Sequence, residues 1–119
     1  VYAAGRDTGA LAAIVALDPS RVVALRLDVT ERGDADAAAR VAGDVDLVIN
    51  NAGTLDFGTV LDATPGSVAR QFDVNVGGPI AVTQAFAPAI SANGGGAVVN
   101  LLSVVGLASM PGLAVYSAS

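Results

Sequence analysis

The sequence predicts an α/β domain in which a parallel sheet carries helices on both faces. Strand-like apolar runs alternate with helical segments along the 119 residues, and this order implies crossover connections between parallel strands. Apolar residues make up 53% of the chain against 14% charged residues, and the mean hydropathy is +0.61, as in a buried sheet. This composition excludes intrinsic disorder, and the length suits one domain.

The first half of the chain predicts two strand–helix units. Strands are expected at residues 1–5 and 21–27, where apolar and β-branched side chains are concentrated. Residues 10–17 are expected to be helical, because their large apolar side chains share one helical face. Residues 31–42 are rich in alanine and begin with acidic residues, which favours a second helix.

The second half begins with a short buried strand at residues 46–50, followed by a turn-rich loop at residues 51–66. A long helix is expected next, because Val68, Phe72 and Val76 are spaced four residues apart.

A Gly-Gly-Pro run at residues 77–79 interrupts the pattern of this helix. A proline inside a helix costs about 3 kcal/mol, so propensity alone would end the helix there. Glycines at residues 94–96 predict a loop, residues 97–102 a strand, and Leu113 the start of a last helix.

The side-chain inventory excludes several classes of function. All six basic residues are arginines, and eleven acidic residues bring the net charge to −5, which disfavours an extended nucleic-acid interface. The sequence contains no cysteine and no histidine, which removes disulfides, thiolate nucleophiles, the usual zinc ligands and imidazole-based triads. Any catalysis must therefore use hydroxyl groups, carboxylates or a cofactor.

No membrane-spanning segment or signal peptide is expected. The longest unbroken apolar stretch, residues 10–17, is far shorter than the roughly 18 residues that a crossing requires. The expected compartment is therefore the cytoplasm. The sequence opens on Val1 rather than Met, within an expected strand, which favours a fragment of a longer protein.

The end of the first expected strand carries a candidate nucleotide contact. Gly5 and Gly9 resemble part of a phosphate-binding turn, but the third glycine of a dinucleotide fingerprint is missing, which disfavours that role. Arg6 lies where a doubly wound sheet meets a dinucleotide ribose, and its planar guanidinium suits a 2′-phosphate. The alternative is a solvated loop arginine.

Two further motifs follow expected strands. Asp28 lies at the carboxyl end of the strand at residues 21–27, and Thr30 is the expected N-cap of the next helix, so capping alone also explains both residues. The Asn-Asn-Ala-Gly run at residues 50–53 predicts a turn where the backbone can approach a flat ligand, with a simple Asn-Gly turn as the alternative.

Three more polar residues, Asn75, Ser103 and Tyr116, lie on different expected elements. Ser103 follows an apolar run, which places it at the carboxyl edge of a buried strand, where open α/β sheets bind ligands. Taken singly, these residues are also explained as a helix-face amide, a turn hydroxyl and a half-buried aromatic.

Taken together, these motifs resemble those of the short-chain dehydrogenase/reductase family over essentially the whole chain. Ser103 precedes Tyr116 by 13 residues, as the resemblance leads one to expect, and Leu102 departs from it where a second serine is common. The matching runs are Asp28-Val29-Thr30, Asn50-Asn51-Ala52-Gly53, Asn75-Val76-Gly77-Gly78-Pro79, Val99-Asn100-Leu101-Leu102-Ser103 and Tyr116-Ser117-Ala118-Ser119.

For the fold, the resemblance implies a partial doubly wound, Rossmann-like sheet that holds the family's strands two to five, as one partial NAD(P)-binding domain at residues 1–119. The family's first strand and its Thr-Gly-x-x-x-Gly-x-Gly turn would precede residue 1, and its lysine would stand at position 120. The first strand lies between the second and the fourth, which predicts a gap between the strands at residues 1–5 and 46–50. The long helix is implied to continue through residues 77–79.

For function, the resemblance implies an NADP-dependent oxidoreductase that interconverts a carbonyl and a secondary alcohol. Tyr116 would exchange a proton with the substrate oxygen, Ser103 would polarise that oxygen, and Asn75 would hold a water in the proton relay. NADP is favoured over NAD because Arg6 follows Gly5, where an acid would select the free ribose hydroxyl. The implied cofactor-binding residues are Arg6, Asp28, Val29, Asn50, Ala52, Gly53 and Tyr116.

The implied partners are a small carbonyl or alcohol substrate and further copies of the parent protein, as a homodimer or homotetramer. No metal, nucleic-acid or membrane partner is expected. Two alternatives stay open: a non-catalytic Rossmann-like fragment or interaction module, and a related epimerase or dehydratase that uses the same serine and tyrosine.

Overall fold

The computed structural model describes residues 1–119 and has the predicted α/β architecture. All strand pairs are parallel, and they form two separate two-stranded sheets. One sheet pairs β1 (Tyr2–Gly5) with β2 (Val23–Arg26), and the other pairs β3 (Leu47–Asn50) with β4 (Ala97–Asn100). Gly5 lies opposite Arg26 and Asn50 opposite Asn100, so the two strands of each sheet end together.

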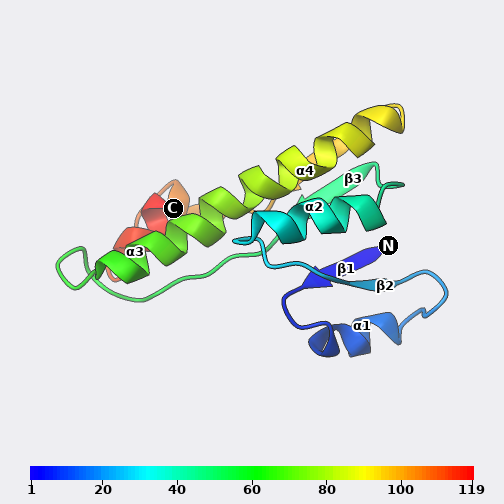
Figure 1. The fold of residues 1–119 in the computed structure, drawn as a ribbon. Coiled ribbons are helices and arrows are strands. Elements are labelled where there is room, and N and C mark those ends of the chain that lie inside the picture. Colours follow the sequence, from blue (N-terminus) through cyan, green and yellow to red (C-terminus); the bar gives the residue numbers. More distant parts are fainter.

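A gap separates the two sheets. β1 pairs only with β2, and β3 pairs only with β4, so each of these strands keeps an unpaired edge. In Figure 1, β1 lies between β2 and β3. The predicted gap between the strands near residues 1–5 and 46–50 is therefore confirmed.

Helices lie on both sides of the sheet formed by β1 and β2 (Figure 1). α1 (Ala12–Val15), preceded by the 3₁₀ turn Gly9–Leu11, lies on one side, and α2 (Arg32–Val41) lies on the other. α2 packs against α4 (Gly78–Ala92), and small alanines on α2 let the two helices approach closely. The core between these helices and the strands consists of Leu27, Ala35, Ala38, Ala42, Val48, Val82, Phe86 and Ile90.

The long helix does continue through the Gly-Gly-Pro run, as the resemblance implied and propensity alone did not. It consists of α3 (Pro65–Phe72), a π-helical turn at Asp73–Gly77 and α4. The N–H of Gly78 donates to the carbonyl of Asp73, five residues back, so the helix changes register just before Pro79. Pro79 then lies in the first turn of α4, where its missing N–H costs little.

Glycine is required where α4 meets the end of β2. A Cβ atom at Gly78 would lie 2.8 Å from Cγ2 of Val29, so any larger residue would push the helix away from the turn after β2. Glycine is also required just before β4, where the chain passes close to the residue before β3. A Cβ atom at Gly96 would lie 1.8 Å from the carbonyl oxygen of Asp46.

Several predicted elements are shorter than expected. The strand expected at residues 21–27 begins only at Val23, because the preceding residues form a turn in which the N–H of Val22 donates to the carbonyl of Asp18 at 2.9 Å. The strand expected at residues 97–102 ends at Asn100, opposite the end of β3. The last helix is α5 (Ala114–Ala118). None of the helices combines the length and the apolar composition needed to cross a membrane.

Candidate nucleotide site

A cavity of about 660 Å³ lies between the two sheets at the carboxyl ends of their strands. Residues from both sheets line it, together with the first part of the loop after β3 and with residues of the long helix, including Arg70, whose guanidinium is paired with Asp56. The structure brings to it every predicted cofactor-binding residue except Tyr116, namely Arg6, Asp28, Val29, Asn50, Ala52 and Gly53.

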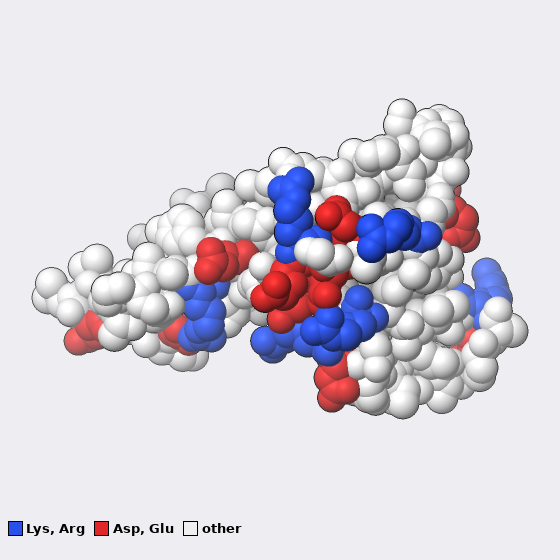
Figure 2. All heavy atoms as spheres, viewed as in Figure 1, with Lys and Arg blue, Asp and Glu red and all other residues white.

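Arg6 is exposed at the end of β1 and lines the cavity without an ion-pair partner. The neighbouring arginine on β2, Arg26, is instead paired with Asp34 of α2 at 2.5 Å. Figure 2 shows side chains of both charges gathered around the N-terminal end of α2, on a surface that is otherwise mostly uncharged. Arg6 is therefore the guanidinium at this edge that is available to an anionic ligand.

The Asp28 carboxylate is held within its own turn. The hydroxyl and the N–H of Thr30 donate to Oδ1 of Asp28 at 2.8 and 3.0 Å. These two hydrogen bonds, and then the positive charges of Arg6 and Arg26, keep the pKa of Asp28 below its usual value.

The predicted N-cap role of Thr30 is wrong. Glu31 occupies the N-cap position of α2, and no side chain caps it. The Thr30 hydroxyl instead donates to the carboxylate of Asp28, two residues earlier. This local hydrogen bond takes the place of a cap on α2. Asp34, in the first turn of α2, instead accepts the N–H of Asp28 at 3.0 Å.

Asn50 begins the Asn-Asn-Ala-Gly turn with a buried side chain that points into the protein. Its amide Nδ2 donates to Oδ1 of Asn100 at 2.8 Å and to the hydroxyl of Thr83 at 3.3 Å. These contacts tie β3 to β4 and to α4 where the turn starts. The contribution of Asn50 at the cavity is thus to fix this turn, and the small residues Ala52 and Gly53 leave the backbone open to a ligand.

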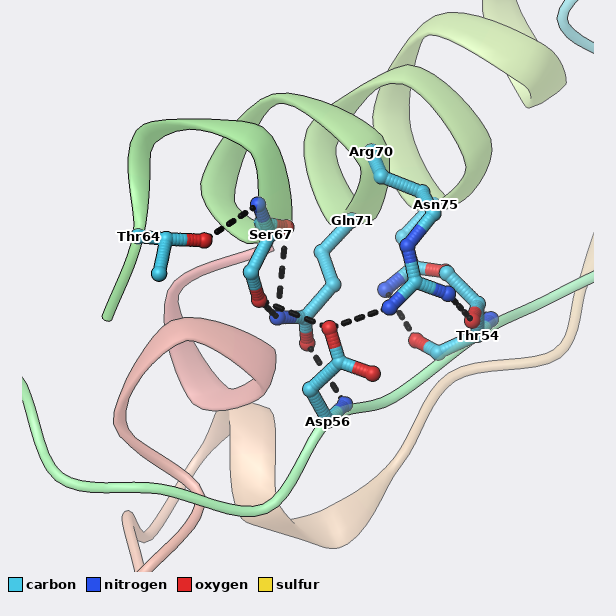
Figure 3. A network of polar contacts seen from close by, with 7 residues as sticks. All are labelled: Thr54, Asp56, Thr64, Ser67, Arg70, Gln71 and Asn75. Atoms are coloured by element: carbon cyan, nitrogen blue, oxygen red, sulfur yellow. Dashed lines mark hydrogen bonds and ion pairs between the residues drawn. The ribbon is translucent and has the colours of Figure 1, made fainter. Parts of the chain in front are cut away.

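Asn75 lies in the π-helical turn and binds the loop after β3. Its Oδ1 accepts the N–H of Thr54 at 2.8 Å, and its Nδ2 donates to the carbonyl of Thr54 at 2.9 Å and to the hydroxyl of Ser119 at 2.8 Å. Figure 3 shows the Asn75 side chain directed at Thr54. Asn75 therefore connects the cavity-lining loop to the end of α5.

Ser103 and Tyr116 lie on neighbouring elements but do not bond to each other. The Ser103 hydroxyl accepts the N–H of Val105 at 3.4 Å and caps the 3₁₀ turn Val104–Gly106, against which α5 packs. Tyr116 is half-buried on α5, and it does not line the cavity. The structure thus brings the serine and tyrosine segments together beside the cavity rather than inside it.

Sequence reasoning missed a group of polar residues beside the cavity, shown in Figure 3. They join the loop after β3 to α3. The members on α3 share one helical face at spacings of three and four residues, which is a signal the sequence carries, whereas no local pattern marks the loop members. The missed residues are Thr54, Asp56, Ser67, Arg70 and Gln71.

The residues present fit a dinucleotide with a phosphorylated ribose. A small-residue turn permits close backbone contact, and an unpaired guanidinium lines the same cavity. Parallel strands that carry such a cavity at their carboxyl ends define the Rossmann-like class of nucleotide-binding proteins.

Comparison with known proteins gives the family. The model of the family described as short chain dehydrogenase matches residues 1–119, and the chain belongs to this family. An uncharacterized oxidoreductase of Methylorubrum extorquens is 34% identical over 120 residues, which cover 96% of this chain and 48% of the relative. The chain spans about half the length of the curated relatives it matches.

Two crystal structures show the same fold with different cofactors. A short chain dehydrogenase from Burkholderia cenocepacia in complex with NADP is 35% identical with a TM-score of 0.89, over 99% of this chain and 48% of that protein. A short chain dehydrogenase/reductase from Burkholderia phymatum in complex with NAD is 32% identical with a TM-score of 0.86, over 98% of this chain and 44% of that protein. The chain is thus similar to proteins that bind either nucleotide.

Proposed function

We propose that this chain is the nucleotide-binding part of an oxidoreductase that uses NADP to interconvert a carbonyl and a secondary alcohol. The observation that carries the proposal is the cavity between the two sheets, which gathers Arg6, Asp28 and the turn at residues 50–53 at the carboxyl ends of parallel strands. The active parent is proposed to be a cytoplasmic homodimer or homotetramer.

The preference for NADP over NAD rests on Arg6. Gly5 carries no charge that would repel a 2′-phosphate, and the Arg6 guanidinium is not engaged by any carboxylate. A guanidinium fork binds a phosphate through two parallel hydrogen bonds, which the free ribose hydroxyl of NAD cannot match. The Asp28 carboxylate is occupied by Thr30, so it does not replace Arg6 as the group that recognises the ribose.

In the proposed reaction, the chain supplies orientation and proton transfer. NADP, when bound, supplies the hydride-transfer chemistry. The phenol of Tyr116 exchanges a proton with the substrate oxygen, and the hydroxyl of Ser103 donates a hydrogen bond to the same oxygen. Tyr116 lies on α5, and Ser103 caps the 3₁₀ turn after β4. These two elements pack against each other.

Asn75 is proposed to hold the relay water through its main-chain carbonyl. Its side-chain amide is already engaged by Thr54 and Ser119. Its carbonyl lacks the usual donor four residues ahead, because Pro79 has no N–H. Pro79 therefore leaves this carbonyl without its regular α-helical partner.

Binding of nucleotides to a full-length protein that contains this chain tests the proposal. Fluorescence titration is expected to show tighter binding of NADPH than of NADH, and initial rates with a panel of carbonyl compounds should show NADPH oxidation. Tyr116→Phe is expected to retain NADPH binding while it lowers turnover about 10²–10⁴-fold. A full-length protein that binds neither nucleotide, or a Tyr116→Phe variant with full activity, would contradict the proposal.

A non-catalytic binding module is the second candidate for the 119 residues taken alone. Tyr116 does not line the cavity, and its hydroxyl is not bonded to Ser103. Nucleotide binding without turnover by the isolated chain would favour this candidate. An epimerase or dehydratase activity of the full-length protein would be detected as substrate conversion without net NADPH oxidation.

A further inference from the structure

The loop after β3 is bound to α3 by a cluster of polar side chains, Asp56, Ser67, Arg70 and Gln71, which we call the Asp56 cluster (Figure 3). The Asp56 carboxylate accepts the hydroxyl of Ser67 at 2.7 Å and the guanidinium of Arg70. The N–H of Asp56 donates to Oε1 of Gln71 at 3.3 Å. Both the side chain and the backbone of Asp56 are therefore held by the helix.

Gln71 is fully buried, and its polar atoms find partners inside this cluster. Its amide Nε2 donates to the hydroxyl of Ser67 at 3.2 Å, while its Oε1 accepts the Asp56 N–H. A buried amide is costly unless it is hydrogen-bonded, so this side chain favours one arrangement of the loop over others. The cluster thus specifies where the loop lies on the helix.

The same helical face extends to the candidate site. Ser67, Gln71 and Asn75 are spaced four residues apart, and Arg70 reaches the hydroxyl of Thr54 at 3.3 Å. Asn75 binds both backbone polar groups of Thr54. Residues 54–56 are consequently fixed to α3 and the π-helical turn at two places.

The charge of Asp56 is stable at neutral pH. The hydrogen bond from Arg70, and then the one from Ser67, lower the pKa of the Asp56 carboxyl below its usual value. The ion pair is partly exposed, with side-chain exposures of 53% for Arg70 and 34% for Asp56. Such partly exposed pairs contribute little to global stability, so their main effect is on local geometry.

We propose that the residues of the Asp56 cluster are positioning residues that hold the cavity-lining backbone of residues 52–54 against Asn75. The inference rests on the proposed function, because it assigns the cluster to the nucleotide site. Ala52, Gly53 and Thr54 line the cavity, and they lie between the buried anchor at Asn50 and the cluster. Releasing Asp56 frees one end of this short segment, so the turn that faces the nucleotide loses its fixed position.

Asp56→Asn is the informative variant, because Asp56 itself does not line the cavity and acts on it through the loop and through its partner Arg70, which does line it. Asp62→Asn is the matched control. Asp62 is an exposed carboxylate of the same loop whose pKa is also lowered by hydrogen bonds, but these come from Thr59 and not from α3. Asp56→Glu retains the charge and serves as the conservative variant.

The measurements are NADPH affinity, hydrogen exchange of residues 52–56 and thermal unfolding, all on a full-length protein that contains the chain. Asp56→Asn is expected to raise the Kd for NADPH about tenfold and to speed exchange of these amides, with an unfolding temperature within a few degrees of the unsubstituted protein. Asp62→Asn should match the unsubstituted protein in all three, and Asp56→Glu should restore the Kd to within about threefold. Ser67→Ala, which removes one donor to Asp56, should act in the same direction if Asp56→Asn fails to fold.

The outcomes separate this inference from the proposed function. If the unsubstituted protein binds NADPH and Asp56→Asn binds it equally well, or if Asp62→Asn weakens binding as much, the positioning role is overturned. If the unsubstituted protein binds neither NADPH nor NADH, the proposed function fails, and the exchange rates still decide the inference. Unchanged exchange of residues 52–56 in Asp56→Asn would then overturn it.

Discussion

Single side chains at the carboxyl ends of the strands decide which ligands the cavity accepts. Arg6 is unpaired, whereas Arg26 beside it is neutralised by Asp34. Asp28 is turned toward Thr30, and Asn50 is turned toward Asn100. The ligand-facing chemistry of this edge is therefore one guanidinium and the backbone of a small-residue turn.

Replacing Arg6 by alanine is expected to erode the preference for NADPH. A hydrogen bond to a charged group contributes roughly 1.5–3 kcal/mol, and 1.4 kcal/mol corresponds to a tenfold change, so the ratio of the NADH and NADPH dissociation constants should fall about tenfold or more. Fluorescence titration with both nucleotides measures this ratio. Arg21→Ala is the control, because Arg21 is also exposed but lies before the opposite end of β2. An unchanged ratio in Arg6→Ala would remove Arg6 from the site.

Acid should weaken the folded state partly through Asp56. The pKa of its carboxyl is lower in the folded chain than the ordinary value of 3.8, because Arg70 and Ser67 hydrogen-bond the ionised form. Its stabilising effect is complete above about pH 5 and is lost as the pH falls through 3.8 toward the folded pKa. Denaturant midpoints at several pH values should show the unsubstituted protein and Asp56→Asn converging as the pH falls. A difference that stays constant with pH would argue against this linkage.

At the scale of elements, the contact between α4 and the end of β2 depends on a glycine. Gly78→Ala would place a methyl group 2.8 Å from Val29, so α4 must shift away from the β2 turn. The expected cost is about 1–3 kcal/mol, because neither the helix nor the β-branched side chain yields easily. Chemical denaturation measures the change in the free energy of unfolding.

Gly33→Ala provides the control for that substitution. Gly33 lies in α2, and a Cβ atom there would meet no neighbour within 4 Å. This change is expected to stabilise the chain by about 0.5–1 kcal/mol, because alanine favours helix over glycine. Equal effects of the two substitutions would mean that the close contact at Gly78 does not restrict packing.

The sequence predicts the kinds of elements better than their contacts. The spacing of Val68, Phe72 and Val76 indicates the long helix, but single-residue propensities break it at Pro79, because propensity does not describe a π-helical register change.

The polar ends of the strands predict where the site lies. They do not predict that Thr30 binds Asp28 instead of capping α2, because two local hydrogen-bonding arrangements compete for the same hydroxyl. The Asp56 cluster escapes prediction because its members become neighbours only when the loop folds back on α3.

At the scale of the whole molecule, the sheet of β1 and β2 and the sheet of β3 and β4 lie on either side of the cavity without pairing. The 119-residue chain expressed alone is therefore expected to show no measurable hydride transfer. In the isolated chain no strand pairs with the facing edges of β1 and β3, so no turn after such a strand presents backbone N–H groups to a pyrophosphate. Tyr116 also lies outside the cavity. Initial-rate assays with NADPH and a broad carbonyl panel test this expectation. Turnover by the isolated chain would show that the two sheets form a working site unaided.

The unpaired edges of β1 and β3 also affect how readily copies of the isolated chain associate with one another. An unpaired strand edge is a template for a strand from another molecule. On β3 the alternate side chains Leu47 and Ile49 are 48% and 56% exposed, which adds an apolar face to that edge. The net charge of −5 opposes association between copies. Solubility of the isolated chain therefore depends on this repulsion, and it should be lowest near the isoelectric point of about 4.2 and at high salt, where the repulsion vanishes.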